Sequence, residues 1–362
     1  MMPPMKRLAA LSLALLAGCT TTAPAPVTRD YRVIAYVRGR TDIGRIGAGK
    51  LTHINYAFGK VSPEGEVVIE PDAPAHFSQL NALKARNPRL KVLISIGGWG
   101  ADNFSDAALT DDSRQKFARS AVALIDRYAL DGVDLDWEYP GQPGPGIKFR
   151  PEDKENFTLL LKTLREQLGS RLLTIASAGG RYFEHTEMDR LHQYLDFVNV
   201  MTYDFAGAWS DVTGHHTPLF RSAAASEKPA SVDFIEQHLR AGIPASKIVL
   251  GVAFYGRSWK GIADVNNGLN QPYQAYDVDV PYARLVAEYL TSPAFERFWD
   301  PVAHAPYLWD RSGGRFVTYD DPQSLLEKAR FVKERGLGGM MYWEHSHDPE
   351  ERLLDVISGE LR

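Results

Sequence analysis

The stretch that decides the fold is Asp131-Gly-Val-Asp134-Leu-Asp136-Trp-Glu138-Tyr-Pro140. Successive side chains of a β-strand point to opposite faces, so Asp134, Asp136 and Glu138 share one face and the apolar residues between them share the other. In a closed parallel sheet one strand face meets the surrounding helices and the other points into the barrel. Because the apolar set suits the helices, we expect the three acids to point inward.

Three acids on one inward face destabilise a fold unless they have a function or a partner. Burying an unpaired carboxylate costs several kcal/mol, roughly, and like charges nearby increase that cost. Sharing a proton relieves it and raises the pKa of at least one acid. Glu138, the last of the three, lies where barrel enzymes place their chemistry, and an acid kept protonated there suits general acid catalysis. The alternative is a solvated strand end that carries acids by chance.

Around this stretch, short apolar or β-branched segments alternate with amphipathic ones. The strand candidates are Arg32–Tyr36, His53–Phe58, Lys91–Ile96, Gly132–Asp136, Leu173–Ala178, Phe197–Met201, Ile248–Ala253 and Gly338–Trp343. Helix candidates between them are Ser113–Tyr128, Pro151–Leu168 and Pro322–Arg335. Eight strands alternating with helices predict an α/β fold, the (β/α)8 TIM barrel, over residues 31–257 and 319–362.

The gap between the seventh and eighth strands is longer than a crossover needs. Residues 258–318 fill it and are rich in Tyr, Phe and Trp. We expect a small α+β insertion module at the rim of the barrel. A disordered loop is the alternative, but the aromatic content argues against it.

The first residues are predicted to direct export. Lys6 and Arg7 precede an apolar run, Leu8–Ala17, that is too short to span a bilayer. Residues 1–18 therefore form the expected lipoprotein signal peptide, since Leu16-Ala17-Gly18-Cys19 resembles the bacterial lipobox, in which the cysteine receives the lipid. An ordinary secretory signal with a chance cysteine is the alternative.

Cys19 is the only cysteine, so no intrachain disulfide can form. Residues 19–30 are rich in Thr, Ala and Pro and are expected to act as a tether. Thr20 follows the cysteine, which by resemblance to known sorting rules favours the outer membrane. The expected location is the bacterial cell envelope, with the chain lipid-anchored through Cys19 and monomeric.

The composition suits a neutral substrate. The formal net charge is only −4 and no long basic run appears, which argues against nucleic acid as a partner. The adjacent His215 and His216 have no nearby cysteine or spaced carboxylate to complete a metal site, so no metal is expected. His345 and His347 are interpreted as polar loop residues after the last strand.

The acidic stretch resembles the DxxDxDxE signature of family 18 glycoside hydrolases, the chitinase family, whose fold is a (β/α)8 barrel. Further matches follow in the family's order. They are Ser95-Ile-Gly97-Gly98-Trp99, Met201-Thr-Tyr203-Asp204, Phe254-Tyr255-Gly256-Arg257 and Gly338-Gly339-Met340-Met341-Tyr342-Trp343. The likeness runs from Tyr31 to the C-terminus, and its combination of motifs is far more specific than any single one.

The resemblance implies a substrate-assisted retaining hydrolase that acts on N-acetylglucosamine-containing glycans without a cofactor. By motif position, Glu138 is the acid and then the base, and Asp136 orients the 2-acetamido group that attacks the anomeric carbon. Asp134 lies below Asp136 and either shares its proton or turns it. Tyr203 and Asp204 hold the acetamido group from another strand.

The same motifs nominate residues for substrate binding. These are Tyr36, Ser95, Gly98, Trp99, Met201, Trp209, Arg257 and Trp343. The family often has an aromatic pair at the end of the first strand, but Val37 replaces the second member here, so only Tyr36 carries over. Ser95 is either a hydrogen-bond donor to the deeper Asp or a small residue chosen for packing.

The large side chains have two interpretations each. The three tryptophans either stack on sugar faces or pack in the core. Arg257 either binds a sugar hydroxyl or pairs with an acid at the rim.

Three functions follow from the resemblance. The first is hydrolysis of β-1,4 linkages in chitin or chito-oligosaccharides. The second is an endo-β-N-acetylglucosaminidase that acts on N-glycans or peptidoglycan. The third is a non-catalytic sugar-binding lectin, although lectin relatives typically lose the acid that Glu138 provides.

Overall fold

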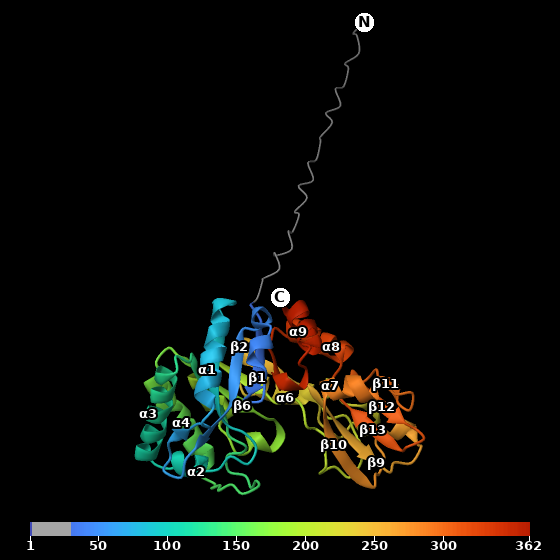
Figure 1. Ribbon diagram of the computed structural model, residues 1–362, viewed down its shortest axis with the longest axis horizontal. Coiled ribbons are helices and arrows are strands. Elements are labelled where there is room, and N and C mark those ends of the chain that lie inside the picture. The colour runs from blue at the N-terminus through green and yellow to red at the C-terminus, as the bar shows by residue number, and fades with distance from the viewer. Residues whose placement is uncertain (2–29) are drawn as a thin grey trace. The chain divides into compact units, whose positions relative to one another are not determined.

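Eight parallel strands close into a barrel, which confirms the predicted fold (Figure 1). The neighbours run β1, β14, β8, β7, β6, β5, β4 and β2, and a β1–β2 pairing closes the ring. The barrel strands are β1 (Arg32–Arg38), β2 (His53–Val61), β4 (Lys91–Gly97), β5 (Gly132–Asp136), β6 (Leu172–Ser177), β7 (Phe197–Val200), β8 (Ile248–Ala253) and β14 (Gly339–Trp343). A short β3 (Val67–Val68) pairs antiparallel with β2.

The computed structural model describes Met1 and residues 30–362. The predicted signal peptide, Cys19 and nearly all of the predicted tether therefore lie outside the described residues. Tyr31–Arg362 form one compact unit, which is considered by itself below.

Helices follow most barrel strands and cover their outer face. They are α1 (Ala73–Ala82), α2 (Phe104–Ala107), α3 (Asp111–Arg127), α4 (Asp153–Leu168), α5 (Met188–Leu191), α6 (Ser231–Arg240), α8 (Pro322–Glu334) and α9 (Arg352–Leu361). Local sequence sets their starts. The Thr110 hydroxyl accepts from the backbone N–H of Ser113 at the start of α3, and Asp321 caps α8 through Ser324 in the same way.

The strand β5 shows why the acids could be predicted to point inward. Val133 and Leu135 are fully buried in the main hydrophobic core, which packs between strands and helices. Asp134 and Asp136 face the barrel interior, with exposed fractions of 0% and 5%. The neighbouring strand approaches closely, since a Cβ added at Gly97, which has φ of +128°, would lie 2.0 Å from the backbone oxygen of Asp136.

Between β8 and β14 the chain forms a second, antiparallel sheet of five strands in the order β10, β9, β13, β12, β11. The strands are β9 (Tyr255–Lys260), β10 (Ala275–Pro281), β11 (Glu296–Asp300), β12 (Ala305–Asp310) and β13 (Arg315–Thr318), and α7 (Tyr282–Arg284) follows β10. In Figure 1 this sheet lies beside the barrel, in orange. The sheet begins at Tyr255, so it includes the end of the segment that the sequence analysis assigned to the barrel.

The second sheet has a small hydrophobic cluster of its own, which includes Trp259, Trp309 and Phe316. Val280 and Leu285, from the end of β10 and just after α7, belong instead to the main core. The inserted segment is therefore packed into the barrel along one edge.

Candidate active site

The C-terminal ends of the barrel strands open into a cleft of about 920 Å³. Ten of the residues nominated from sequence line it: Tyr36, Trp99, Asp136, Glu138, Met201, Tyr203, Asp204, Trp209, Arg257 and Trp343. Three others do not. Asp134 and Ser95 lie fully buried beneath the floor, and a Cβ at Gly98 would meet the ring of Phe58 at 2.6 Å, so Gly98 makes room for that ring.

Asp134 is held by four side-chain donors. The hydroxyls of Tyr36 and Ser95 donate to its Oδ2 at 2.9 and 2.8 Å. The Thr174 hydroxyl and the Asn199 amide donate to its Oδ1 at 2.5 and 3.2 Å. Burial raises the pKa of Asp134, and these hydrogen bonds oppose that rise. Ser95 is thus a donor to the deeper acid, one of the two interpretations made from sequence.

Asp136 and Glu138, the next two acids along the chain after Asp134, both line the cleft. Burial, reinforced by the charges of Glu138 and Asp134, raises the pKa of Asp136 well above its usual range. Its Oδ1 has no hydrogen-bond partner among the described residues. Burial likewise raises the pKa of Glu138 to about 7. The arrangement therefore keeps a proton on a cleft acid at near-neutral pH, and it leaves a free acceptor beside that acid.

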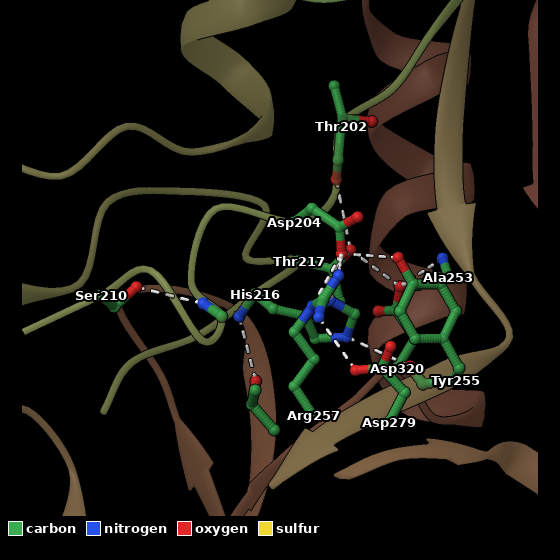
Figure 2. A network of polar contacts seen from close by, with 12 residues as sticks. Thr202, Asp204, Ser210, His216, Thr217, Ala253, Tyr255, Arg257, Asp279 and Asp320 are labelled. Carbon is green, nitrogen blue, oxygen red and sulfur yellow. Dashed lines mark hydrogen bonds and ion pairs between the residues drawn. The ribbon is translucent and has the colours of Figure 1, made fainter. Parts of the chain in front are cut away.

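Asp204 has the opposite electrostatic environment (Figure 2). It accepts from the Tyr255 hydroxyl at 2.6 Å and from Arg257 at 2.6 and 2.8 Å. Burial raises its pKa, but the nearby imidazole of His216 and the charge of Arg257 outweigh that effect and lower the pKa to about 2. Asp204 is therefore ionised in the same cleft as Asp136 and Glu138, whose pKa values burial raises.

Arg257 is occupied by acids of the protein. Besides Asp204, it donates to Asp279 of β10 at 2.9 Å, and its guanidinium lies 4.8 Å from the ring centroid of Trp209. Two interpretations of Arg257 were made from sequence, and the structure agrees with the one in which it pairs with a rim acid.

A second polar layer supports this network from behind (Figure 2). His216 Nδ1 lies 3.6 Å from Asp204, and its other ring nitrogen is 3.1 Å from the backbone oxygen of Tyr255. Next to it, the Thr217 hydroxyl bonds Asp320 at 3.0 Å, and Lys328 contacts both at 2.7 Å. His216 thus lies against Asp204 and is held in place by the backbone oxygen of Tyr255.

The tryptophans occupy two kinds of place. Trp343 lies on the cleft floor, with its ring centroid 5.5 Å from stacked Phe58 and 5.7 Å from Tyr36. Trp99 and Trp209 stand on the rim, with exposed fractions of 65% and 63%. Core packing, the alternative considered for these two, is therefore wrong. Exposed aromatic faces in a cleft suit the apolar faces of sugars.

Sequence reasoning missed several cleft residues. They are Arg38, Phe58, Lys60, Tyr139, Gln142, Arg181, Tyr182, Phe205, Tyr255, Asp279 and His347, among others. Arg38 and Lys60 had an available signal, because each lies two residues after an aromatic residue, Tyr36 or Phe58, that faces the cleft. His347, interpreted as a loop residue, lines the cleft from a short 3-10 turn after β14.

The described part of the chain contains no group of three His, Cys, Asp or Glu side chains placed to hold a metal ion. Across residues 30–362, none of the helices is both long enough and apolar enough to cross a membrane.

Comparison with known proteins gives a consistent result. A family model described as glycosyl hydrolases family 18 matches residues 32–348. Chitinase A1 of Niallia circulans is 37% identical over 94% of this chain, which spans 60% of that relative's length. Chitinase B of Serratia marcescens is 32% identical over 83% of this chain and 74% of the relative.

Solved structures agree with the sequence matches. A family 18 N-acetylglucosaminidase from Paenibacillus barengoltzii superposes with a TM-score of 0.85 at 42% identity, over 91% of this chain and 99% of that one. The chitinase ChiW from a Paenibacillus species superposes with a TM-score of 0.87 at 39% identity, over 92% of this chain and 43% of that one.

Proposed function

The chain belongs to family 18 of the glycosyl hydrolases, and we propose that it hydrolyses β-1,4 linkages between N-acetylglucosamine units of chitin or chito-oligosaccharides. The observation that carries this proposal is β5 with Asp134 and Asp136, followed two residues later by Glu138, which lines the cleft and has a pKa raised to about 7. The chitinases among its relatives support the substrate class.

In the first step, Glu138 donates its proton to the glycosidic oxygen as the bond from that oxygen to the anomeric carbon breaks. The carbonyl oxygen of the substrate's own 2-acetamido group attacks the anomeric carbon and forms a cyclic oxazolinium ion. Asp136 accepts a hydrogen bond from the acetamido N–H and stabilises the positive charge of the oxazolinium ion. Its Oδ1 is suited to accept this bond because it has no partner among the described residues.

In the second step, the Glu138 carboxylate takes a proton from water while that water attacks the anomeric carbon. The ring of the intermediate reopens, and two inversions give net retention of the β configuration. Asp134, fixed by its four hydrogen-bond donors, supports Asp136 from below. Tyr203 and Asp204, which follow β7, contact the acetamido group.

The single-strand arrangement favours this route over a two-carboxylate mechanism. A retaining enzyme of the usual type needs an acid and a nucleophile on opposite sides of the sugar ring. Asp136 and Glu138 are same-face neighbours on one chain segment, so both approach the substrate from one side.

The experiment that tests this function compares wild type with Glu138→Gln on chito-oligosaccharides. The amide keeps the shape and removes the proton, so hydrolysis should fall by roughly 10³-fold or more while binding survives. Glu155→Gln, an exposed acid of α4, is the matched control and should keep full activity. Comparable turnover by Glu138→Gln would refute the assignment.

A second candidate is release of single N-acetylglucosamine units, because a structure 42% identical to this chain is of an N-acetylglucosaminidase. Product analysis on chitin oligomers, N-glycans and peptidoglycan side by side separates the candidates. Release of only the monosaccharide from every oligomer length would favour the second, and internal cleavage of chitin would favour the first.

We also propose that the chain is exported and lipid-anchored at the bacterial outer membrane through Cys19. The support is the sequence alone: a basic start, a short apolar run and Leu16-Ala17-Gly18-Cys19 before a Pro-rich tether. In that place the cleft would meet glycans of the envelope or its surroundings.

A further inference from the structure

The cleft is lined by positively charged side chains that have no role in the proposed cleavage of a neutral glycan. Four cationic side chains line it: Arg38, Lys60, Arg181 and Arg257. Arg257 alone is neutralised, by Asp204 and Asp279. Within residues 30–362 the other three make no ion pair, although the charges of Asp136 and Glu138 act on Lys60 from a distance.

Arg38 and Lys60 form a basic wall on neighbouring strands. Arg38 shares a strand face with Tyr36 at the end of β1, and Lys60 shares one with Phe58 on β2, which pairs with β1. Burial lowers the pKa of Lys60 and the charge of Arg38 adds to that effect, while Asp136 and Glu138 oppose it. Lys60 is partly buried and anchored, since its Nζ donates to the Gly97 backbone oxygen at 2.6 Å.

The guanidinium of Arg38 is exposed and makes no hydrogen bond in the described part of the chain. Two like charges held together without an anion destabilise each other. The repulsion between Arg38 and Lys60 does not stabilise the fold, whereas a bound anion would relieve it.

Arg181 provides a second cation across the mouth. It lies in the 3-10 turn Gly180–Phe183 that follows β6. β6 is opposite β1 in the ring, reached through β14, β8 and β7 in one direction and through β2, β4 and β5 in the other. The basic wall and Arg181 therefore flank the acids at the centre from two sides.

The acids of the cleft do not cancel these charges. Asp204 and Asp279 are committed to Arg257. Burial raises the pKa values of Asp136 and Glu138, which reduces the negative charge of these two acids near neutral pH. Arg38, Lys60 and Arg181 therefore add positive charge along the substrate's path, although the whole chain has a formal net charge of −4.

We propose that the cleft binds a glycan in which N-acetylglucosamine alternates with carboxylate-bearing sugars, with Arg38 and Lys60 binding one carboxylate and Arg181 another. This inference rests on the proposed function in that it keeps Glu138 as the acid and N-acetylglucosamine at the cleaved bond, and it differs from chitin because the neighbouring sugars carry carboxylates. Arginine is suited to the task, because its guanidinium matches a carboxylate with two parallel hydrogen bonds.

The same carboxylate chemistry has two sources, a lactyl ether as in N-acetylmuramic acid and a uronic acid. The test therefore uses two tetrasaccharide series in which N-acetylglucosamine alternates with one or the other. Each series has a matched neutral ligand, the methyl ester of the same oligomer. Affinities are measured by calorimetry with Glu138→Gln, so that the ligand stays intact.

We expect the acid of at least one series to bind about tenfold tighter than its ester at low salt, as a charge-assisted contact provides. The preference should weaken as salt is added. Adding Arg38→Gln or Lys60→Gln should remove most of it. Arg89→Gln is the control, an exposed arginine just before β4, at the other end of the barrel strands. The series that shows the preference identifies the source of the carboxylate.

Equal binding of acid and ester in both series would overturn the inference. A preference that survives both Arg38→Gln and Lys60→Gln would overturn it as well. Circular dichroism of each variant confirms that it is folded. Hydrolysis of neutral chitotetraose by wild type is a separate measurement, so failure of the proposed function is distinguishable from failure of this inference.

Discussion

Glu138 shows how one residue obtains its reactivity from its surroundings. Its side chain is an ordinary carboxyl, yet burial at the end of β5 raises its pKa to about 7. Asp204, which lines the same cleft, has a pKa lowered to about 2 by His216 and Arg257, against the effect of burial. The same chemical group thus has two protonation states in one cleft, and the environment decides which acid donates a proton.

The first prediction concerns the pH dependence of kcat/KM. The reacting form needs a proton on Glu138, and a raised pKa keeps that proton on the acid until the pH passes about 7. Activity should therefore fall on the alkaline side with a midpoint near pH 7. The measurement is kcat/KM on a chromogenic chito-oligosaccharide from pH 4 to 9, approximately. An alkaline limb centred near the ordinary glutamate pKa would contradict this picture of Glu138.

A second prediction concerns the donors beneath the floor. Thr174→Val removes the hydroxyl that donates to Asp134 at 2.5 Å and keeps the shape, so unfolding free energy should fall by about 1–2 kcal/mol. The control is Thr158→Val, because the buried Thr158 hydroxyl has no partner in the described residues and its loss should cost nothing. Urea denaturation of both variants makes the comparison, and equal stabilities would show that the Asp134 donors contribute nothing to stability.

Residue-level sequence reasoning succeeded where the pattern is local. The alternation along one strand predicted which way Asp134, Asp136 and Glu138 point. It did not predict the pairing of Asp204 with Arg257, because that contact joins residues 53 positions apart through the geometry of a second sheet. Trp209 was ambiguous for a similar reason, since its exposure depends on how a long loop is placed.

At the scale of elements, strands were easier to predict than their junctions. All eight barrel strands lie where apolar runs indicated, and β5 and β8 have the predicted bounds. The second sheet begins earlier than expected because β9 follows β8 after a single residue, Phe254, with no linker to mark the change. Apolar periodicity indicates which residues are buried. Because β8 and most of β9 are both buried, it does not show where one sheet ends and the other begins.

The helix α8 offers a third prediction. Lys328 is fully buried and contacts Asp320 and Thr217, so Lys328→Met would leave a buried carboxylate without its counter-ion. Such a loss typically costs about 3–5 kcal/mol. Lys333→Met, on the same helix but with an exposed side chain, is the control and should change stability little.

Thermal or urea unfolding provides the measurement for both lysine variants. The double variant Lys328→Met/Asp320→Asn should recover part of the loss, because the uncompensated charge is then absent. If Lys328→Met is as stable as Lys333→Met, the buried pair does not hold α8 to the loop that carries Thr217.

For the whole molecule, the remaining question is where the barrel works. The proposed anchor lies outside the described residues, and only the sequence around Cys19 supports it. The fourth prediction is that Cys19→Ala, expressed with its signal, is recovered in soluble or unprocessed form while wild type partitions with membranes and carries lipid. Full membrane partitioning of a lipidated Cys19→Ala variant would refute the anchor.

The central claim is that the substrate's acetamido group is the nucleophile and Glu138 the acid on the same strand as Asp136. Proton NMR of the first anomer that wild type releases from chitotetraose, paired with mass spectrometry of the enzyme trapped during turnover, tests it most directly. Two displacements at the anomeric carbon predict that the β anomer appears first and the α anomer grows in later by mutarotation. An initial α anomer would mean direct attack by water, and a sugar bonded to an Asp or Glu would mean an enzymic nucleophile; either result would contradict the account.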